Sequence, residues 1–447
     1  MAIKQIISKP ELHSSENLKI KGWVTNIRGN LNIKFVEIND GSSIVNLQCV
    51  LKKDKIDFEK ISNLSLGSAI EVSGVFKYTP ERQQSGELIV DKIDILSLSD
   101  VNEFPIQNKE TTVEFLRQIP HIRHRTKLFR AVMRLRSALF FEINSFFENE
   151  GFLNFSAPIL TSNDGEGAGE TFLVDDEKGG FFNKKTTLGV TGQLHAESYA
   201  LGFGKVYTFA PTFRAEKSNT KKHAAEFWMV EPEVAFFNLQ DIIGLGDKML
   251  KFVIKNVLEK NKDEFDFLEK YLGIKIRQRL LEFYKSPVKQ IDYKDAIELL
   301  LKHKDQFEVQ ELYFGADLKT EHERFLAENI FNAPVAVINY PKSLKAFYMH
   351  QNDDGKSVAA FDLLVPGIGE LIGGSQREVR YEKLLERIKE LNMSQEDLQW
   401  YLDLRKFGNA GSSGFGLGFE RLVMYITGID NIRDVIPYPR TNKNILM

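Results

Sequence analysis

The sequence predicts an α+β protein of more than one domain, with a small β-barrel or sandwich ahead of a larger body built on an antiparallel sheet flanked by helices. Three observations lead to this prediction. The chain has 447 residues, too many for one ordinary hydrophobic core. Residues 18–97 read as short strands divided by turns. From Thr126 the apolar residues recur at helical spacing, and strand-like and glycine-rich stretches follow.

The first region contains the strand-like stretches LKIKGWV, IKFVEI, IVNLQCV, AIEVSGVF and ELIVDKIDIL. Turn residues such as Asn39-Asp40-Gly41 separate them. Several strands at this spacing are typical of a small barrel or sandwich. Pro105 and Pro120 then interrupt the pattern. We therefore expect a first domain at residues 1–104 and a linker or hinge at 105–125.

The second region, residues 126–447, opens with a predicted long amphipathic helix. Gly151 suits the C-terminal cap of this helix. Its apolar positions at helical spacing are Leu128, Val132, Leu135, Leu139, Ile143 and Phe146. The stretches KVYTFAPTF, EFWMVEPEVAF, VAVINY and AAFDLLV then read as strands. Residues 240–333 are mostly helical and charged in pattern, which indicates an insertion.

The composition excludes several classes of protein. No run of about 18 apolar residues is present, so we expect no membrane span. The N-terminus lacks the charged-then-apolar layout of a signal peptide. Cys49 is the only cysteine, which rules out an internal disulfide or a thiolate zinc cluster and favours a reducing cytoplasm. With a formal net charge of −3, a nucleic-acid partner would have to bind local basic patches.

A strand followed by a basic loop is the first candidate for chemistry. In FRAEKSNTKKHAAEFWMVEPE, residues 213–233, Arg214 ends an apolar strand. The loop after it carries Lys217, Lys221, Lys222 and His223. Such a loop can fold over a polyphosphate while the strand holds one guanidinium rigidly. From charge alone, a hairpin with a solvated basic tip is the more ordinary explanation.

Two glycine-rich stretches complete the set. In GFGLGFERL, glycines 414, 416 and 418 leave room for a ligand near the backbone, and Arg421 then opens a helix where it could cover a nucleotide. In FDLLVPGIGELIGGSQR, Asp362 and Glu370 stand eight positions apart. Magnesium favours one or two carboxylates together with phosphate oxygens and water. Surface acids on two strands are the alternative.

These stretches, in this order, resemble the three signature motifs of the class II aminoacyl-tRNA synthetases; the helix leading to FSAPIL is the first motif. With a barrel at the N-terminus, the chain looks like the subgroup for aspartate, asparagine and lysine. The second motif and the ending NIRDVIPYPRT are most similar to asparagine-specific members. The resemblance implies an ATP-dependent ligase that makes asparaginyl adenylate from L-asparagine and esterifies it onto tRNA(Asn). It also implies Mg²⁺, a homodimer, and no DNA or membrane partner.

The resemblance assigns roles to residues. Arg214 and Arg421 match catalytic groups. The residues that match ATP-binding groups are Arg214, Glu216, His223, Phe227, Glu370 and Arg421. Asp362 and Glu370 match the acids that hold magnesium. Glu166 and Gln193 match groups for the α-ammonium of the amino acid, and Glu231 and Arg377 match groups that meet its side chain.

The N-terminal module resembles an OB-fold that binds an anticodon. Phe35 stands where the family stacks a base, and Arg28 would touch a phosphate or is merely solvated. Register from Phe35 puts Asn46 at the base-reading position, and Gln48 two residues on would share its face. Either amide could read a uracil edge, so both stay open.

Two positions favour asparagine over aspartate. In Gln193-Leu194-His195-Ala196, alanine stands where aspartate-specific members carry a lysine. Glu231 replaces an aspartate of those members. A pocket with a longer anion and one fewer cation should reject a second carboxylate. The alternatives are an aspartate ligase of relaxed specificity, or a related non-ligase such as an asparagine synthetase or an RNA-binding module with an inactive catalytic domain. The barrel and the retained arginines argue against a non-ligase.

Overall fold

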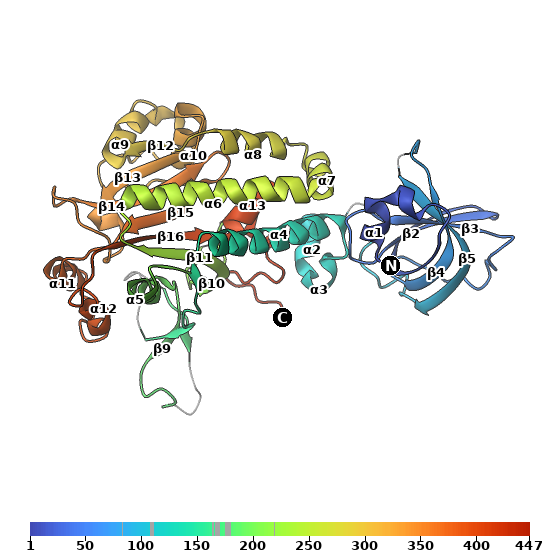
Figure 1. The fold of residues 1–447 in the computed structure, drawn as a ribbon, viewed down its shortest axis with the longest axis horizontal. Helices are drawn as coiled ribbons and strands as arrows, with labels where there is room; N and C mark the ends of the chain where they lie inside the picture. Colours follow the sequence, from blue (N-terminus) through green and yellow to red (C-terminus); the bar gives the residue numbers. More distant parts are fainter. Residues whose placement is uncertain (83, 108–110, 163–164, 166–169, 175–179, 219) are drawn as a thin grey trace. The chain divides into compact units, whose positions relative to one another are not determined.

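The computed structural model describes residues 1–447 apart from 83, 108–110, 163–164, 166–169, 175–179 and 219. The chain divides into two compact units, Met1–Arg134 and Leu135–Met447. Each unit has a hydrophobic core of its own. Figure 1 shows the elements of both.

The first unit contains a closed barrel, which confirms the predicted strands. Alternate residues of its first strand point inward, so that Leu18, Ile20 and Val24 are buried while Lys19 and Lys21 are exposed. The hydrogen-bonded order is β1-β2-β3-β5-β4, with bounds β1 (Asn17–Gly29), β2 (Ile33–Asn39), β3 (Leu47–Lys52), β4 (Ala69–Tyr78) and β5 (Gly86–Ser97). Closure of the barrel leaves no free sheet edge.

Short helices precede and follow the barrel along the chain. A short helix, α1 (Ile3–Ser8), precedes it, and α2 (Val113–Gln118) and α3 (Pro120–Arg123) follow it. The predicted linker is therefore partly helical. Pro120 falls in the first turn of α3, where its missing N–H costs nothing.

The predicted long helix is α4 (Lys127–Asn149), which spans the division between the units. It buries all the apolar positions that the helical spacing selected: Leu128, Val132, Leu135, Leu139, Ile143 and Phe146. Gly151 has φ +77° and donates its N–H to the carbonyl of Glu148. This left-handed geometry, which glycine adopts readily, confirms the predicted cap.

The second unit is built on an eight-stranded sheet in the order β12-β13-β14-β15-β16-β11-β10-β6. Only the edge pairs β12–β13 and β10–β6 are parallel; the other pairs are antiparallel. The bounds are β6 (Leu153–Asn154), β10 (Lys205–Phe213), β11 (Glu226–Ala235), β12 (Lys289–Asp292), β13 (Val335–Pro341), β14 (Ser357–Val365), β15 (Gly369–Gln376) and β16 (Ser412–Gly418). The predicted antiparallel sheet is thus confirmed.

Helices cover the sheet. Figure 1 shows α6 (Leu239–Lys260) running along it, and this helix packs against β14, β15 and β16. Helix α5 (Gln193–Phe203) packs on β10 and β11, and α13 (Phe419–Thr427) packs on β11 and β16. The remaining helices are α7 (Lys262–Leu272), α8 (Ile276–Lys285), α9 (Tyr293–Leu301), α10 (Thr320–Phe325), α11 (Tyr381–Glu390) and α12 (Gln399–Asp403). Residues 240–333 therefore supply most of the helices and the edge strand β12.

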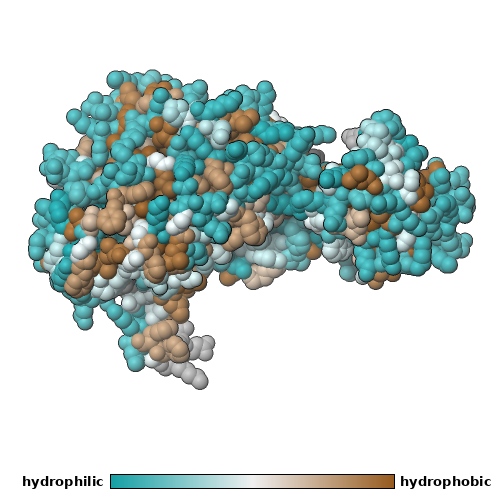
Figure 2. Space-filling view, viewed as in Figure 1, coloured by the Kyte–Doolittle hydropathy of each residue, from teal (hydrophilic) through white to brown (hydrophobic). Residues whose placement is uncertain are grey.

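A separate three-stranded sheet, β7-β9-β8, comprises β7 (Leu160–Thr161), β9 (Thr186–Leu188) and β8 (Leu173–Val174). Among the described residues, no helix combines the length and the apolar character needed to cross a membrane. Figure 2 shows a surface that is mostly hydrophilic, with separate hydrophobic patches.

Candidate active site

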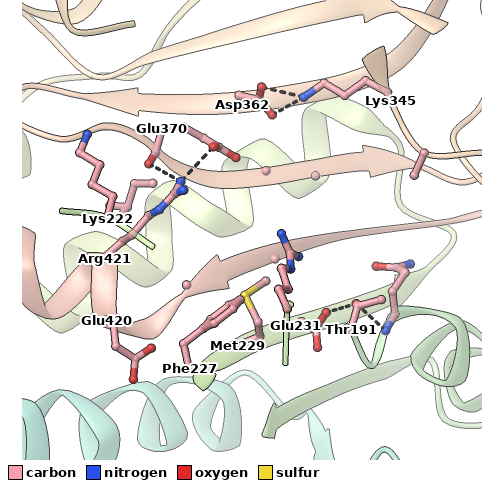
Figure 3. A pocket seen from close by; sticks show the side chains of 18 of the residues that line it. Thr191, Lys222, Phe227, Met229, Glu231, Lys345, Asp362, Glu370, Glu420 and Arg421 are labelled. Carbon is pink, nitrogen blue, oxygen red and sulfur yellow. Dashed lines mark hydrogen bonds and ion pairs between the residues drawn. The ribbon is translucent and has the colours of Figure 1, made fainter. Parts of the chain in front are cut away.

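A pocket of about 330 Å³ lies over β11, β14, β15 and β16 of the second unit. Figure 3 shows Glu370, Arg421 and Asp362 in one part of it and Glu231 and Thr191 in another. The predicted residues that line it are Gln193, Arg214, Glu216, His223, Phe227, Glu231, Asp362, Glu370, Arg377 and Arg421. Glu166 falls outside the described residues. One cavity thus gathers side chains from segments more than 200 residues apart in sequence.

Arg214 follows β10 directly and is held by the neighbouring strand. Its N–H donates to the carbonyl of Ala225 at 3.0 Å. Its guanidinium carbon lies 5.5 Å from the centre of the Phe227 ring, on β11. The strand pair therefore places the guanidinium of Arg214 beside the Phe227 ring.

The basic loop borders the same end of the pocket. Lys222 donates from Nζ to the carbonyl of Ile368. Burial and the nearby Arg421 lower the pKa of Lys222 to about 8. His223 lies 3.8 Å from Glu216, and burial lowers its pKa as well. The loop thus places one titrating cation at the wall of the cavity.

The two predicted metal ligands face one small space. A Cβ at Gly373 would lie 3.0 Å from Glu370 Oε1 and 3.3 Å from Asp362 Oδ1, so glycine keeps this space open. Lys345 Nζ binds both oxygens of Asp362 at 2.7 Å, and Arg421 Nη1 binds Glu370 Oε2 at 3.0 Å. Two carboxylates that converge on one gap fit a magnesium ion that completes its shell with water and phosphate. Among the described residues no group of three or more acids, histidines or cysteines forms a metal cage.

The charges of these acids follow from their surroundings. Burial raises the pKa of Asp362 despite Lys345. For Glu370, loss of solvent opposes ionisation, but Arg421 and Lys345 outweigh it and lower the pKa. A third acid, Glu323, was not predicted. Burial and the neighbouring Glu370 raise its pKa to about 7.

Glu231 lies in the other part of the pocket and is already hydrogen-bonded. One oxygen accepts from the hydroxyl of Thr191, and the other accepts from the N–H of Gly192 at 2.9 Å. The side chain is 4% exposed. The two donors fix the carboxylate in one orientation at the pocket wall.

Arg377 is the centre of a buried polar network. Its Nε and Nη2 bind Glu233, with the shortest distance 2.9 Å. Its Nη2 also donates to the amide oxygen of Gln193 at 2.6 Å, and Nη1 donates to Ser375 at 2.7 Å. Glu197 extends the network, since it accepts from Gln193, Arg405 and Tyr401. The guanidinium is therefore rigid and its charge is balanced inside the protein.

This network corrects one interpretation. Glycine at position 414 was expected to make room for a ligand. A Cβ there would overlap Glu233 and Arg377, so this glycine makes room for the buried ion pair. Glu233 was not predicted, although it lies two residues beyond Glu231 on one face of β11, and strand alternation could have indicated it.

In the barrel, the predicted residues share one face. Arg28 is paired with Phe35 across β1 and β2, and its guanidinium lies 5.5 Å from the ring centre. Arg28 also donates to Gln48 at 2.7 Å, and Gln48 donates to Glu87 at 3.1 Å. Gln48 is thus oriented by a cation and an anion beside the aromatic ring.

Asn46 lies ahead of β3 and has other partners. Its amide nitrogen donates to Glu37 and its oxygen accepts from Asn39, both at 3.1 Å. Of the two amides left open by the sequence, only Gln48 contacts the cation that lies on the Phe35 ring. Gln48, and not Asn46, thus belongs to the cluster of Arg28 and Phe35.

Known proteins resemble this chain over its whole length. The family model for class II tRNA synthetases (D, K and N) matches residues 112–442, and that for the OB-fold nucleic acid binding domain matches residues 18–96. Asparagine–tRNA ligase of Mesomycoplasma hyopneumoniae (strain 7448) is 70% identical over 100% of this chain and 99% of its own length. Its counterpart in Mycoplasmopsis pulmonis (strain UAB CTIP) is 61% identical over 100% of both chains.

Among solved structures, asparaginyl-tRNA synthetase from Pyrococcus horikoshii complexed with asparaginyl-adenylate superimposes with a TM-score of 0.89 at 32% identity. The match covers 100% of this chain and 99% of that one. Together these matches confirm the OB-fold and the class II catalytic fold that the sequence predicted.

Proposed function

The chain belongs to the asparagine–tRNA ligase family of the class II aminoacyl-tRNA synthetases and is an ATP-dependent ligase; from this premise we propose how its residues carry out the reaction. The relatives favour asparagine over the aspartate alternative. The observation that carries our assignment is that one pocket holds Arg214, Arg421 and Glu370 beside Glu231 and Arg377.

In the first step the α-carboxylate of asparagine attacks the α-phosphorus of ATP, and the bond to pyrophosphate breaks. Arg214 stabilises the negative charge that develops on the phosphorus centre, and Phe227 stacks on adenine. Arg421 and His223 hold the remaining phosphates, and Glu216 touches the base of ATP or the end of the tRNA. In the second step the 3′-terminal ribose hydroxyl of tRNA(Asn) attacks the adenylate carbonyl and AMP leaves. Positioning and electrostatics supply the catalysis.

Asp362 and Glu370 would hold Mg²⁺, which screens the charge of the departing pyrophosphate when it is bound. The converging carboxylates and the open space at Gly373 support this assignment. Lys345 balances the charge of Asp362 by binding both of its oxygens.

The side chain of asparagine has a carbonyl acceptor and an amide donor. Among hydrogen bonds between described residues, the second N–H of Arg377 Nη1 is not used. We assign this donor to the asparagine carbonyl and Glu231 to the amide. Glu166 and Gln193 would bind the α-ammonium; the amide oxygen of Gln193 has a second lone pair for this beside the one that Arg377 uses.

The barrel would bind the anticodon of tRNA(Asn). Phe35 stacks on a base and Gln48 reads the uracil edge, with Arg28 and Glu87 fixing the direction of its amide. In this assignment Arg28 orients Gln48, and its other N–H groups would touch a phosphate.

The protein would act as a homodimer in the cytoplasm, without DNA or a membrane as a partner. Large apolar side chains are exposed on α4, β6 and α5, which border β10 of the sheet: Phe141 (67%), Leu153 (41%), Tyr199 (45%) and Phe203 (62%). An exposed apolar surface of this kind favours association. Sedimentation equilibrium would show twice the mass of the chain, and the monomer mass would exclude the dimer.

We also propose domain limits of 1–104 for the anticodon-binding domain, 105–125 for the hinge and 126–447 for the catalytic domain. The last barrel strand ends at Ser97 and α4 begins at Lys127, which supports these limits. Within the catalytic domain, residues 240–333 would form the helical insertion.

ATP–pyrophosphate exchange tests the function. The wild type should exchange with asparagine far faster than with aspartate. Arg214→Ala should lower the rate by about 10²–10³ because one charge-stabilising donor is lost. Lys217→Ala is the matched control, since Lys217 is in the same loop but does not line the pocket. Equal rates with both amino acids would contradict the assignment.

A further inference from the structure

The turn at residues 366–369 carries Glu370 into the pocket. It joins β14 to β15, and two of its four residues, Gly367 and Gly369, have no side chain. Three charged side chains from other segments bind its backbone: Glu328 accepts from the N–H of Gly367 at 2.7 Å, Lys222 donates to the carbonyl of Ile368, and Glu323 accepts from the N–H of Glu370 at 3.0 Å. The backbone conformation of the turn is thus held by side chains from other segments of the chain.

Of these three side chains, Glu323 acts nearest to the carboxylate of Glu370. It lies on α10, and its carboxylate fills the space beside Gly369 that a Cβ would occupy. Gly369 has φ +86°, a conformation that side chains disfavour. The backbone at 369–370 is therefore strained for residues other than glycine. Glu323 holds the N–H of Glu370, while Arg421 Nη1 donates to its carbonyl at 3.3 Å and β14 pairs with the strand.

The direction of this backbone decides where the Glu370 side chain points. Its carboxylate meets Arg421 at 3.0 Å, and its other oxygen faces the space at Gly373. A rotation of the peptide between residues 369 and 370 would move the carboxylate away from both. Groups that orient a metal ligand in this way commonly change metal affinity by about 10–100-fold when they are removed.

We propose that Glu323 is a positioning residue for the nucleotide–metal site: by holding the N–H of Glu370 it sets the carboxylate of Glu370 toward Arg421 and the magnesium space. This inference rests on the proposed function, in which Glu370 helps to bind Mg²⁺ and ATP. It adds to that function a residue that touches neither substrate nor metal.

Glu321 provides a matched comparison on the same helix. It also accepts from two backbone N–H groups, of Glu308 at 2.9 Å and Val309 at 2.8 Å. Neither glutamate lines the pocket, but only Glu323 binds the backbone of a residue that does, Glu370. If Glu323 only stabilises the fold, its removal should resemble the removal of Glu321.

The test measures ATP binding to the full-length protein by calorimetry, once with Mg²⁺ and once with EDTA. The dissociation constant with EDTA divided by the dissociation constant with Mg²⁺ reports the contribution of the metal. This measurement requires no turnover. Glu323→Ala should lower this ratio by about tenfold, while Glu321→Ala should leave it within about twofold of wild type. Glu323→Gln keeps an acceptor and should restore most of the ratio.

Each result bears on the proposal. The proposal is overturned if Glu323→Ala has the same ratio of dissociation constants as the wild type. It is also overturned if Glu323→Gln has the ratio of the alanine variant, because the charge of Glu323 and not its hydrogen bond would then matter. If the alanine variant does not fold, Glu323→Asp replaces it, since a side chain shorter by one methylene cannot reach the N–H of Glu370. Lack of asparagine-dependent exchange in the wild type would instead count against the proposed function, while the metal ratio still tests Glu323.

Discussion

At the scale of single residues, the selectivity that we propose for the pocket depends on Glu231, whose two carboxylate oxygens already accept hydrogen bonds within the protein. Thr191 and Gly192 both donate to Glu231. This arrangement also fits the simpler explanation, in which Glu231 is a strand residue that stabilises the fold. The two explanations differ in what they predict for aspartate, whose side chain would place a second anion against Glu231. A contact between like charges in a closed site costs several kcal/mol, or on the order of 10²–10⁴ in selectivity.

We therefore expect Glu231→Gln to lower the rate of exchange with asparagine and to narrow the gap to aspartate by about tenfold or more. Exchange with both amino acids, measured on wild type and variant, gives the ratio directly. Thr191→Val is the control: it removes a hydrogen bond from the same carboxylate but keeps the charge, so the rate should fall while the ratio stays. If Glu231→Gln has the same ratio of exchange rates with asparagine and aspartate as the wild type, the role of Glu231 is purely structural.

The residues that the sequence did not reveal share one property. Lys345, Glu323 and Glu197 each act through a partner that is distant in the chain: Asp362, Glu370 and Arg405, respectively. No spacing within a short stretch indicates such a pair, since the tertiary fold brings the partners together. The residues in FRAEKSNTKKHAAEFW and GFGLGFERL were found because their neighbours along the chain formed a pattern.

At the scale of elements, periodicity predicted the strands and the long helix well. The apolar positions of α4 and the alternating strand β1 follow directly from the 3.6- and 2-residue repeats. Register between strands was harder. The irregular segment between β2 and β3 hid the pairing of Glu37 with Gln48, which places Gln48 on the Phe35 face. The two short helices of the predicted linker were also missed. For α3 the reason is that Pro120 was taken as a breaker although it occupies the first turn of the helix.

The basic loop gives a prediction at this scale. Lys222 has a pKa of about 8 in the folded protein, so it loses its proton between pH 7 and 9. Affinity for ATP with Mg²⁺ should fall over this range in the wild type. Lys222→Arg keeps the charge and should bind with little dependence on pH. Calorimetric titrations at several pH values measure both.

Unfolding would not explain such a loss of affinity. The folded pKa of Lys222 lies below its ordinary value of 10.5, so deprotonation favours the folded state. The contribution of this lysine to stability therefore rises with pH between about 8 and 10.5. If the affinity for ATP depends on pH in the same way in wild type and Lys222→Arg, a group other than Lys222 causes the loss of affinity.

At the scale of the whole molecule, the two units should separate into two activities. A protein that lacks residues 1–104 retains every described residue that lines the pocket. It should still make asparaginyl adenylate, but charging of tRNA should fall sharply because the anticodon contacts are lost. Exchange and aminoacylation assays on one preparation distinguish these steps. Normal charging by the truncated protein would assign the barrel another role.

The buried network around Arg377 also limits how this protein can change over evolution. One guanidinium serves Glu233, Gln193 and Ser375, and Glu197 links the network to Arg405. Removing any one member leaves a buried charge or donor without its partner, a loss that commonly costs about 3–5 kcal/mol for a charge. Single substitutions at these positions are therefore costly. We expect these positions to change in evolution only together with compensating substitutions on several strands and helices.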